Sequence, residues 1–221
     1  MSEIVESGEQ LKSLARERRL GGHTYRGVVC PGLRLDGGDL FGATLEQVTL
    51  GSAQLEGVDL SRASLSRVDL RQARLTGALA AHTHFADCDL TEVSLAGAIL
   101  EETTLERTLL ANVDFDGAKL VGCRFLACNL YGVKLRRSVL IRCSFGDPAL
   151  NGMAELTKAQ LASATVLECD FRAANLIRAD FSGALLVRCN FAGAMLTGVK
   201  IDGARFVQCN FAGADLPDGL R

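Results

Sequence analysis

The sequence predicts an all-β fold in which the chain winds into a square parallel coil, preceded by one short helix. Three observations predict it. A large apolar residue, Leu or Phe, stands at every fifth position from Leu35 to Phe145, except at Ala80. A small residue stands two positions before most of them, often followed by Asp or Asn. A Cys-x-Phe triplet also recurs, beginning at Cys123, Cys143, Cys169, Cys189 and Cys209.

A period of five fits neither the helical period of about 3.6 nor the alternation of a strand. It fits a chain that bends after every five residues, with one large and one small side chain inside and three in water. Four bends close a coil of about 20 residues, and stacked coils pair as parallel strands about 4.8 Å apart. The 20-residue spacing of most triplets is then one full coil. This spacing predicts an interior column of thiols beside a column of aromatic rings.

The single 26-residue spacing, from Cys143 to Cys169, predicts an interruption of the coil. After Phe145 the five-residue series resumes at Leu156, one step out of phase. A competing register treats Leu150 as another corner, but it breaks the columns, and we reject it. We expect six residues to be looped out at about 146–153, GDPALNGM, whose Gly, Asp-Pro and Asn-Gly are typical of turns. The columns that this register keeps continuous are Cys123, Cys143, Cys169, Cys189 and Cys209, with Phe125, Phe145, Phe171, Phe191 and Phe211.

The N-terminal segment differs from the repeat. Residues 7–20 contain helix-forming residues, with Leu11, Leu14 and Ala15 on one side, and a Gly-Gly pair follows that would end a helix. We expect this helix to cap the N-terminal edge of the coil, which would otherwise expose unpaired strand groups.

The predicted organisation has three parts. These are residues 1–22 with the capping helix, residues 23–216 as a single solenoid, and a short tail at 217–221. The tail is too short to cap the second end of the solenoid. The coil around Phe206, Phe211 and Leu216 is therefore a candidate contact for a homodimer.

The repeat resembles that of the pentapeptide-repeat proteins, whose consensus is A-(D/N)-L-x-x. The stretches 174–176 (Ala-Asn-Leu), 179–181 (Ala-Asp-Phe) and 214–216 (Ala-Asp-Leu) match it, and the resemblance covers roughly residues 25–216. It implies a pentapeptide-repeat solenoid, a right-handed quadrilateral parallel β-helix. A fold of this kind does not fix an activity.

Composition and charge restrict the cell compartment and the classes of ligand that we expect for this protein. The formal net charge of −2 on 221 residues gives no global field that would attract nucleic acid or a membrane surface. Residues 1–19 are charged rather than apolar, and no run reaches the ~18 apolar residues of a membrane span. Eight cysteines without an export signal favour free thiols in a reducing compartment. We expect a cytoplasmic protein without direct nucleic-acid or membrane binding.

No catalytic, cofactor-binding or metal-binding residue is predicted, and we expect no enzyme. Seven cysteines occupy the small inward position, where a thiol acts as a small apolar group. His82 and His84 provide two ligands without a third, at the irregular position Ala80, where we interpret Leu79 as having slipped out of register. No phosphate-binding loop or nucleophile elbow is present.

Surface charge is the functional signal in this sequence. Eight acids and one base lie between Asp87 and Asp116, giving −7, and six bases without an acid lie between Lys119 and Arg142, giving +6. We interpret these blocks as an acidic belt beside a basic belt, either incidental or a docking surface for a protein. The candidate partner-binding residues are Asp87, Asp89, Glu92, Glu101, Glu102, Glu106, Asp114, Asp116, Lys134, Arg136 and Arg137, with Asp147 and Asn151 in the loop.

The sequence supports two candidate functions. The first is a non-enzymatic solenoid scaffold that binds an unknown protein through its charged outer faces and the 146–153 loop. The alternative comes from the resemblance, because some pentapeptide-repeat proteins bind bacterial DNA gyrase by mimicking duplex DNA and protect it from quinolones or other gyrase poisons. Those relatives are acidic along the rod and dimerise through a C-terminal helical segment. The basic block of this chain departs from that pattern.

Overall fold

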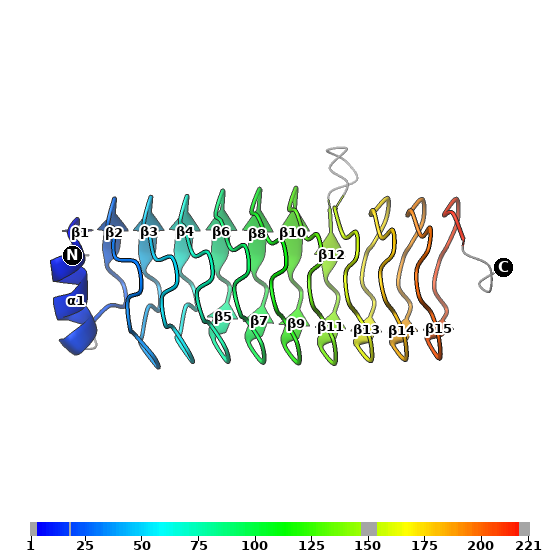
Figure 1. The fold of residues 1–221 in the computed structure, drawn as a ribbon, viewed down its shortest axis with the longest axis horizontal. Coiled ribbons are helices and arrows are strands. Elements are labelled where there is room, and N and C mark those ends of the chain that lie inside the picture. The colour runs from blue at the N-terminus through cyan, green and yellow to red at the C-terminus, as the bar shows by residue number, and fades with distance from the viewer. Residues whose placement is uncertain (1–3, 18, 147–153, 217–221) are drawn as a thin grey trace.

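The computed structural model is a rod of about ten stacked turns with one short helix at its N-terminal end (Figure 1). It describes residues 4–17, 19–146 and 154–216. The helix is α1 (Gly8–Glu17). The strands are β1 (Ile4–Val5), β2 (Thr24–Arg26), β3 (Thr44–Glu46), β4 (Ser64–Ser66), β5 (Leu79–Ala81), β6 (His84–Ala86), β7 (Ile99–Glu101), β8 (Thr104–Glu106), β9 (Lys119–Val121), β10 (Arg124–Leu126), β11 (Val139–Ile141), β12 (Ser144–Phe145), β13 (Thr165–Leu167), β14 (Leu185–Val187) and β15 (Arg205–Val207).

Each turn of the rod has four sides, which we call faces 1 to 4 in chain order. Face 1 carries the parallel sheet β1-β2-β3-β4-β6-β8-β10-β12, and face 4 carries the parallel sheet β15-β14-β13-β11-β9-β7-β5. Faces 2 and 3 are held by single parallel bridges, such as Thr49 with Asp69 and Gln54 with Arg74. Face 4 leads into face 1 of the next turn. The predicted parallel quadrilateral β-helix with a short N-terminal helix is confirmed.

The interruption lies where the sequence predicts it. Up to the bridge between Leu109 and Asn129, partners on adjacent turns keep the 20-residue spacing, but Asn129 pairs with Glu155 and Lys134 with Gln160. The same 26-residue step joins β11 to β13, where Leu140 lies opposite Val166. The six-residue register is therefore confirmed and the competing register is wrong. The loop residues 147–153 lie outside the described residues.

Stacked rings fill the C-terminal half of the interior. Phe125, Phe145, Phe171, Phe191 and Phe211 form one column, with successive ring centroids 4.7 to 5.1 Å apart and nearly parallel planes. Their Cys neighbours form the second predicted column, buried except at Cys209, which is half-buried. Because each turn repeats the same inward residues, rings and thiols stack without a change of backbone register.

The small inward position accepts polar side chains because the preceding turn satisfies them. The Thr83 hydroxyl donates to the Leu60 carbonyl at 2.8 Å, and the Cys143 thiol lies 3.4 Å from the Leu120 carbonyl, 23 residues earlier in both cases. Among the described residues, no buried side-chain nitrogen or oxygen lacks a hydrogen-bond partner. Free Cys and Thr therefore replace Ala here without leaving an unpaired buried group.

Two local features make the bends. An Asp or Asn side chain before the large apolar residue accepts a hydrogen bond from the backbone N–H two positions on, as from Phe41 to Asp39 at 2.8 Å. The second residue after the apolar position has a positive φ, such as 67° at Gly117, which glycine adopts without a Cβ clash. Asp, Asn and Gly thus shape the bends of the coil.

The interpretation of Leu79 as a register slip is wrong. Ala80 is 1% exposed and lies opposite Leu100 in the regular ladder of face 4. Leu79 points outward from β5 and is 41% exposed. The repeat is therefore unbroken here, with Ala in the large inward position and an apolar side chain on the outer surface.

The two ends of the rod differ. At the N-terminal end α1 packs Leu11 against the core, and β1 adds a strand that the sequence did not predict, with Val5 opposite Tyr25. The Ser7 hydroxyl accepts a hydrogen bond from the backbone N–H of Gln10 at the start of the helix. At the C-terminal end, Phe206, Phe211 and Leu216 are only partly buried. The division at residues 22 and 216 stays a prediction.

No helix in the described part of the chain is long and apolar enough to cross a membrane.

Candidate protein-interaction surface

The outward side chains carry whatever specificity this rod has, because repeated apolar side chains fill its interior. Within residues 4–17, 19–146 and 154–216, no group of three or more His, Cys, Asp or Glu side chains is arranged to hold a metal ion. Burial raises the pKa of the Cys88 and Cys128 thiols to about 11, which makes them poor nucleophiles near neutral pH.

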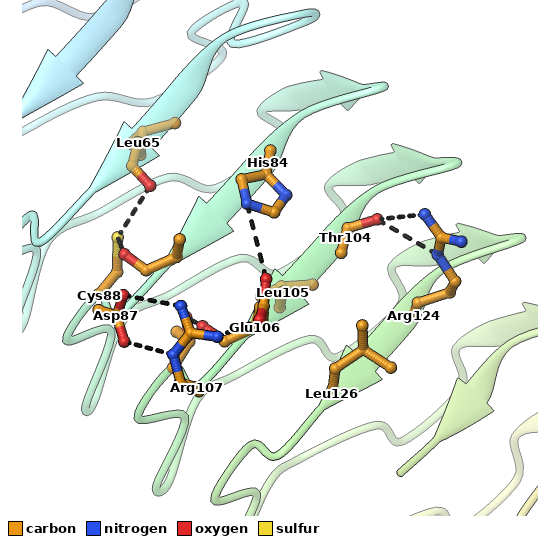
Figure 2. A network of polar contacts seen from close by, with 12 residues as sticks. Leu65, His84, Asp87, Cys88, Thr104, Leu105, Glu106, Arg107, Arg124 and Leu126 are labelled. Atoms are coloured by element: carbon orange, nitrogen blue, oxygen red, sulfur yellow. Dashed lines mark hydrogen bonds and ion pairs between the residues drawn. The ribbon is translucent and has the colours of Figure 1, made fainter. Parts of the chain in front are cut away.

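On face 1 the charged residues form a compact network (Figure 2). Arg107 donates two hydrogen bonds to Asp87 on the preceding turn, at 2.7 and 3.0 Å, and a third to Glu106. The hydrogen bond from Arg107 lowers the pKa of Asp87, and the same contact raises the pKa of Arg107. His84 Nε2 lies 4.0 Å from Glu106. Two of the predicted acids are thus tied to the single base of the acidic block.

On face 3 the end of the acidic block meets the basic block. Asp116 lies 2.6 Å from Arg136 Nη2 and 3.7 Å from Arg137 Nη2, and its side chain is only 10% exposed. Asp114 is bridged to Lys134 through their backbones on successive turns. These five predicted residues are brought together, and they form the densest cluster of candidate residues. We call them the face 3 cluster.

The remaining candidates are spread over faces 2 and 4. On face 4 Glu101 pairs with Lys119 at 3.2 Å, and Glu102 lies over Gly122 of the next turn, which leaves room for it. On face 2 Asp89 lies 3.7 Å from Arg71. Glu92 on the same face accepts a hydrogen bond from the Gln72 amide at 3.0 Å. Asp147 and Asn151 lie outside the described residues.

The two charge blocks do not form two separate belts of free charge. A block as long as one turn of the coil passes around all four faces, so its acids point in four directions. Bases that follow one turn later then lie directly against those acids, as at Lys119 and Arg136. Charge patterning alone did not predict this neutralisation of charge between turns.

A second outer surface was missed by the sequence reasoning. The seven face 4 strands from β5 to β15 have fourteen outward positions, and ten of them are apolar. The sequence contains the signal for this apolar surface, because strands such as VLI and LLV are apolar at the positions before and after the inward residue. These outward apolar residues are Leu79, Ala81, Ile99, Val121, Val139, Ile141, Leu167, Leu185, Val187 and Val207.

The five-residue repeat decides the family. The profile of the family Pentapeptide repeats matches eight copies, in segments covering residues 39–77, 69–107, 88–126, 154–193 and 174–213. The chain belongs to the pentapeptide-repeat family. The matched segments end at residue 126 and resume at residue 154, on either side of the stretch with the 26-residue step.

Solved structures share the fold of this pentapeptide-repeat protein. HetL from the cyanobacterium Nostoc sp. strain PCC 7120, a pentapeptide-repeat protein involved in heterocyst differentiation regulation, is 28% identical, with 99% of this chain and 88% of HetL covered and a TM-score of 0.55. QnrB1, a plasmid-mediated fluoroquinolone resistance protein, is 17% identical, with 83% and 93% covered and a TM-score of 0.68. The likeness to QnrB1 shows the fold alone. No curated protein sequence matches the chain.

Proposed function

We propose that this pentapeptide-repeat protein is a non-enzymatic scaffold that binds a protein partner through its charged outer faces and the 146–153 loop. The observation that carries the proposal is the contrast between a uniform interior and a varied exterior. From Ala43 to Leu196 the interior of the described turns is one core of buried apolar side chains, with Thr or Ser at four of the small inward positions. The features that distinguish the surface of one turn from that of the next are therefore outward side chains, and a partner protein can recognise them from outside the rod.

The face 3 cluster is the best candidate for the charged contact. Lys134, Arg136 and Arg137 supply three cations on one turn, and Asp116 holds two of the guanidinium groups in place. A preoriented guanidinium loses less conformational entropy when it binds a carboxylate than a free one does. The cluster therefore suits an acidic segment of a partner protein, and in the sequence the 146–153 loop begins about half a turn after it.

Affinity capture with matched baits tests this proposal. The wild-type chain, Lys134→Glu/Arg137→Glu, and the control Arg178→Glu on face 2 are immobilised equally, and bound proteins are quantified by mass spectrometry. We expect at least one protein to bind wild type and the control alike and to be lost at least about 10-fold from the double variant. A partner spectrum identical for all three baits would contradict a role for the face 3 cluster.

The alternative function is a DNA-mimicking factor that binds DNA gyrase and gives resistance to quinolones or other gyrase poisons. The fold shared with a fluoroquinolone resistance protein makes this alternative worth testing. A mimic of duplex DNA needs unpaired negative charge along one side, whereas Asp87, Glu101 and Asp116 are each paired with a base. A gyrase supercoiling assay with and without a fluoroquinolone decides between the scaffold and the DNA mimic. Protection of gyrase at a stoichiometric concentration of the protein would support mimicry. The absence of protection at a large excess of the protein would exclude it.

A homodimer through the C-terminal coil belongs to the same proposal. Phe206 and Phe211 pack edge to face at 5.5 Å and are only partly buried, so the end of the described rod presents core side chains and an unpaired strand edge at β15. A second copy with the same exposed end would bury both the partly buried side chains and the strand edge.

The eight free cysteines fit a reducing compartment, and a cytoplasmic location is part of this proposal.

A further inference from the structure

Face 4 is unlike the other sheet-bearing face of the rod. Its strands run along one side of the rod in Figure 1, from β5 to β15, and ten of their fourteen outward positions are apolar. On face 1 the six strands of three residues have two apolar outward positions out of twelve, Ala86 and Leu126. Strands of parallel sheets are apolar on both sides where both sides are covered. Face 4 has the composition of a covered sheet.

The charges of face 4 are separated along the rod. From Asp39 to Glu102 this face carries four carboxylates (Asp39, Asp59, Glu101, Glu102) and one guanidinium, Arg62. From Lys119 to Gln208 it carries four cations (Lys119, Arg142, Arg188, Arg205) and one carboxylate, Glu168. The stretch from Asp39 to Glu102 is therefore negative by three charges and the stretch from Lys119 to Gln208 positive by three, and the change of sign falls beside β9. The turn before Asp39 adds Arg19, which is paired with Glu17 on its own copy.

We propose that face 4 binds face 4 of a second copy of this chain, with the two rods antiparallel and a two-fold axis at β9. A two-fold axis parallel to the strands reverses the rod but keeps each outward column opposite the same column. The negative half of one copy then lies on the positive half of the other. Parallel rods would instead place each half on a half of the same sign, which costs free energy in an interface.

The register centred on β9 matches charged and apolar residues turn by turn. β7 lies opposite the partner's β11, so Glu102 faces Arg142 and Ile99 faces Val139. Two turns from the axis, Ala81 faces Leu167. At the end of the face, the turn that carries Asp39 and Phe41 lies opposite β15. Asp39 then faces Arg205, and Phe41 faces Val207.

An open hollow at the N-terminal end of face 4 supplies a second, independent observation. It has a volume of about 730 Å³, and its lining includes Asp39, Asp59, Phe41 and three glycines, together with His23 and Arg19, whose guanidinium is paired with Glu17 at 3.3 Å. In this register Arg205 of the second copy enters the hollow beside its carboxylates. No ion pair holds Arg205 or Arg142 within the described part of the chain.

Each cation that faces a like charge of the second copy already contacts a carboxylate or an aromatic ring of its own copy. Lys119 lies next to the axis and is held by Glu101 at 3.2 Å. Arg62 faces Arg188, but Arg62 lies over the Phe41 ring at 5.6 Å and Arg188 is paired with Glu168 at 2.8 Å. These contacts direct each cation to a neighbour on its own rod. The charges that meet an opposite charge, at Asp39, Glu102, Arg142 and Arg205, have no ion pair among the described residues of their own copy, while Asp59, also without one, lies opposite Leu185.

The size of the face sets the expected affinity. Nine turns at the strand spacing and five residues in width give about 600 Å² for each copy, or about 1,200 Å² in total. This is near the lower limit of about 1,000 to 1,200 Å² for specific interfaces. We expect a dimer that dissociates in about the micromolar range and weakens with salt, because the charged contacts lie at a solvated rim.

Sedimentation velocity of the full chain over a concentration series tests the interface, with a charge-swap cycle as the decisive step. We expect Glu102→Arg and Arg142→Glu each to raise the dimer Kd at least about 10-fold. The double variant Glu102→Arg/Arg142→Glu should return within about 3-fold of wild type, because both copies of the contact are then restored with reversed sign. Arg178→Glu, at the equivalent position on face 2, is the matched control for Arg142→Glu and should leave the Kd unchanged.

Several outcomes would overturn the proposal. These are a monomer at every concentration up to the millimolar range, single swaps without effect, or a double variant no tighter than the single ones. Circular dichroism identifies any variant that fails to fold, and Glu102→Gln with Arg142→Gln then replaces the swap and must weaken the dimer. Small-angle scattering separates this dimer from one through the C-terminal coil, because antiparallel rods of about 50 Å stay close to that length whereas end-to-end rods reach about 100 Å. The longer particle would contradict the face 4 interface and support the end contact.

Discussion

Asp116 and Arg136 are one full turn of the coil apart in sequence, and their side chains lie 2.6 Å apart on successive turns of face 3. The backbone N–H of Arg136 also donates to Asp116 Oδ1 at 3.1 Å. One carboxylate therefore holds both the main chain and the guanidinium of the next turn. Asp116 ends the acidic block of the sequence and Arg136 lies inside the basic block. The 20-residue length of the coil is what converts two opposite blocks into a contact.

Replacing Asp116 with Ala should destabilise the rod and release Arg136. Loss of the bond to the backbone N–H of Arg136 alone should lower the free energy of unfolding by about 1 kcal/mol. Urea denaturation measures this loss. Asp202 occupies the equivalent position on face 3 and is exposed, so Asp202→Ala is the matched control and should have little effect. Equal losses in the two variants would show that the inter-turn contact contributes nothing.

The inward residues made most of the fold predictable. The five-residue period fixes the number of sides, and the regular recurrence of the Cys123 and Phe125 pair fixes the length of a turn. The single 26-residue step between Cys143 and Cys169 predicts the place of the interruption. β1 was not predictable, because two residues with one buried side chain carry no repeat signal.

The candidate surface was less predictable because outward positions carry no constraint from the core. That the charge blocks mark a binding surface stays a prediction, and the neutralisation of Asp87 by Arg107 depends on side-chain directions that the repeat does not fix. Leu79 shows the converse error. An exposed leucine next to an inward alanine suggested a slipped register, whereas it marks the apolar outer surface of face 4.

Replacing Phe191 with Ala should be strongly destabilising. Its ring is buried between Phe171 at 4.9 Å and Phe211 at 5.1 Å, and a cavity in this column cannot close without moving the neighbouring turns. We expect the free energy of unfolding to fall by about 3–5 kcal/mol. Phe41→Ala, at a ring that is 45% exposed, should cost less than about 1 kcal/mol in the same denaturant titration. A loss at Phe191 as small as that at Phe41 would be inconsistent with its place in the stacked column.

Deleting residues 148–153 should leave a folded rod. The deletion restores the 20-residue spacing, and Gly146-Asp147 then forms the turn before Ala154. Asp is acceptable at the second turn position, since Asp87 has a φ of 55° there. We expect an unchanged β-sheet circular dichroism spectrum. Deleting residues 107–112 also removes six residues, but it shifts the repeat by one position and should abolish cooperative unfolding. Loss of the β signal in the first variant would favour the register with one inserted residue.

The buried thiols should make the rod less stable at alkaline pH. Burial raises the pKa of Cys88 and Cys128 from 9.0 to about 11. Between these values the unfolded chain loses protons that the folded chain keeps, so stability that is present below pH 9 is lost as the pH rises through about 11. Each thiol should contribute a loss of about 2–3 kcal/mol across this window.

Cys88→Ala/Cys128→Ala isolates this effect, because Ala is already the usual residue at the small inward position, as at Ala63 and Ala98. Urea denaturation at pH 8, 9, 10 and 11 should give a falling free energy of unfolding for wild type and a flatter profile for the double variant. Lysine and tyrosine titrate in both proteins and cancel in the difference. Parallel profiles would mean that the two thiols ionise in the folded chain as readily as in the unfolded one.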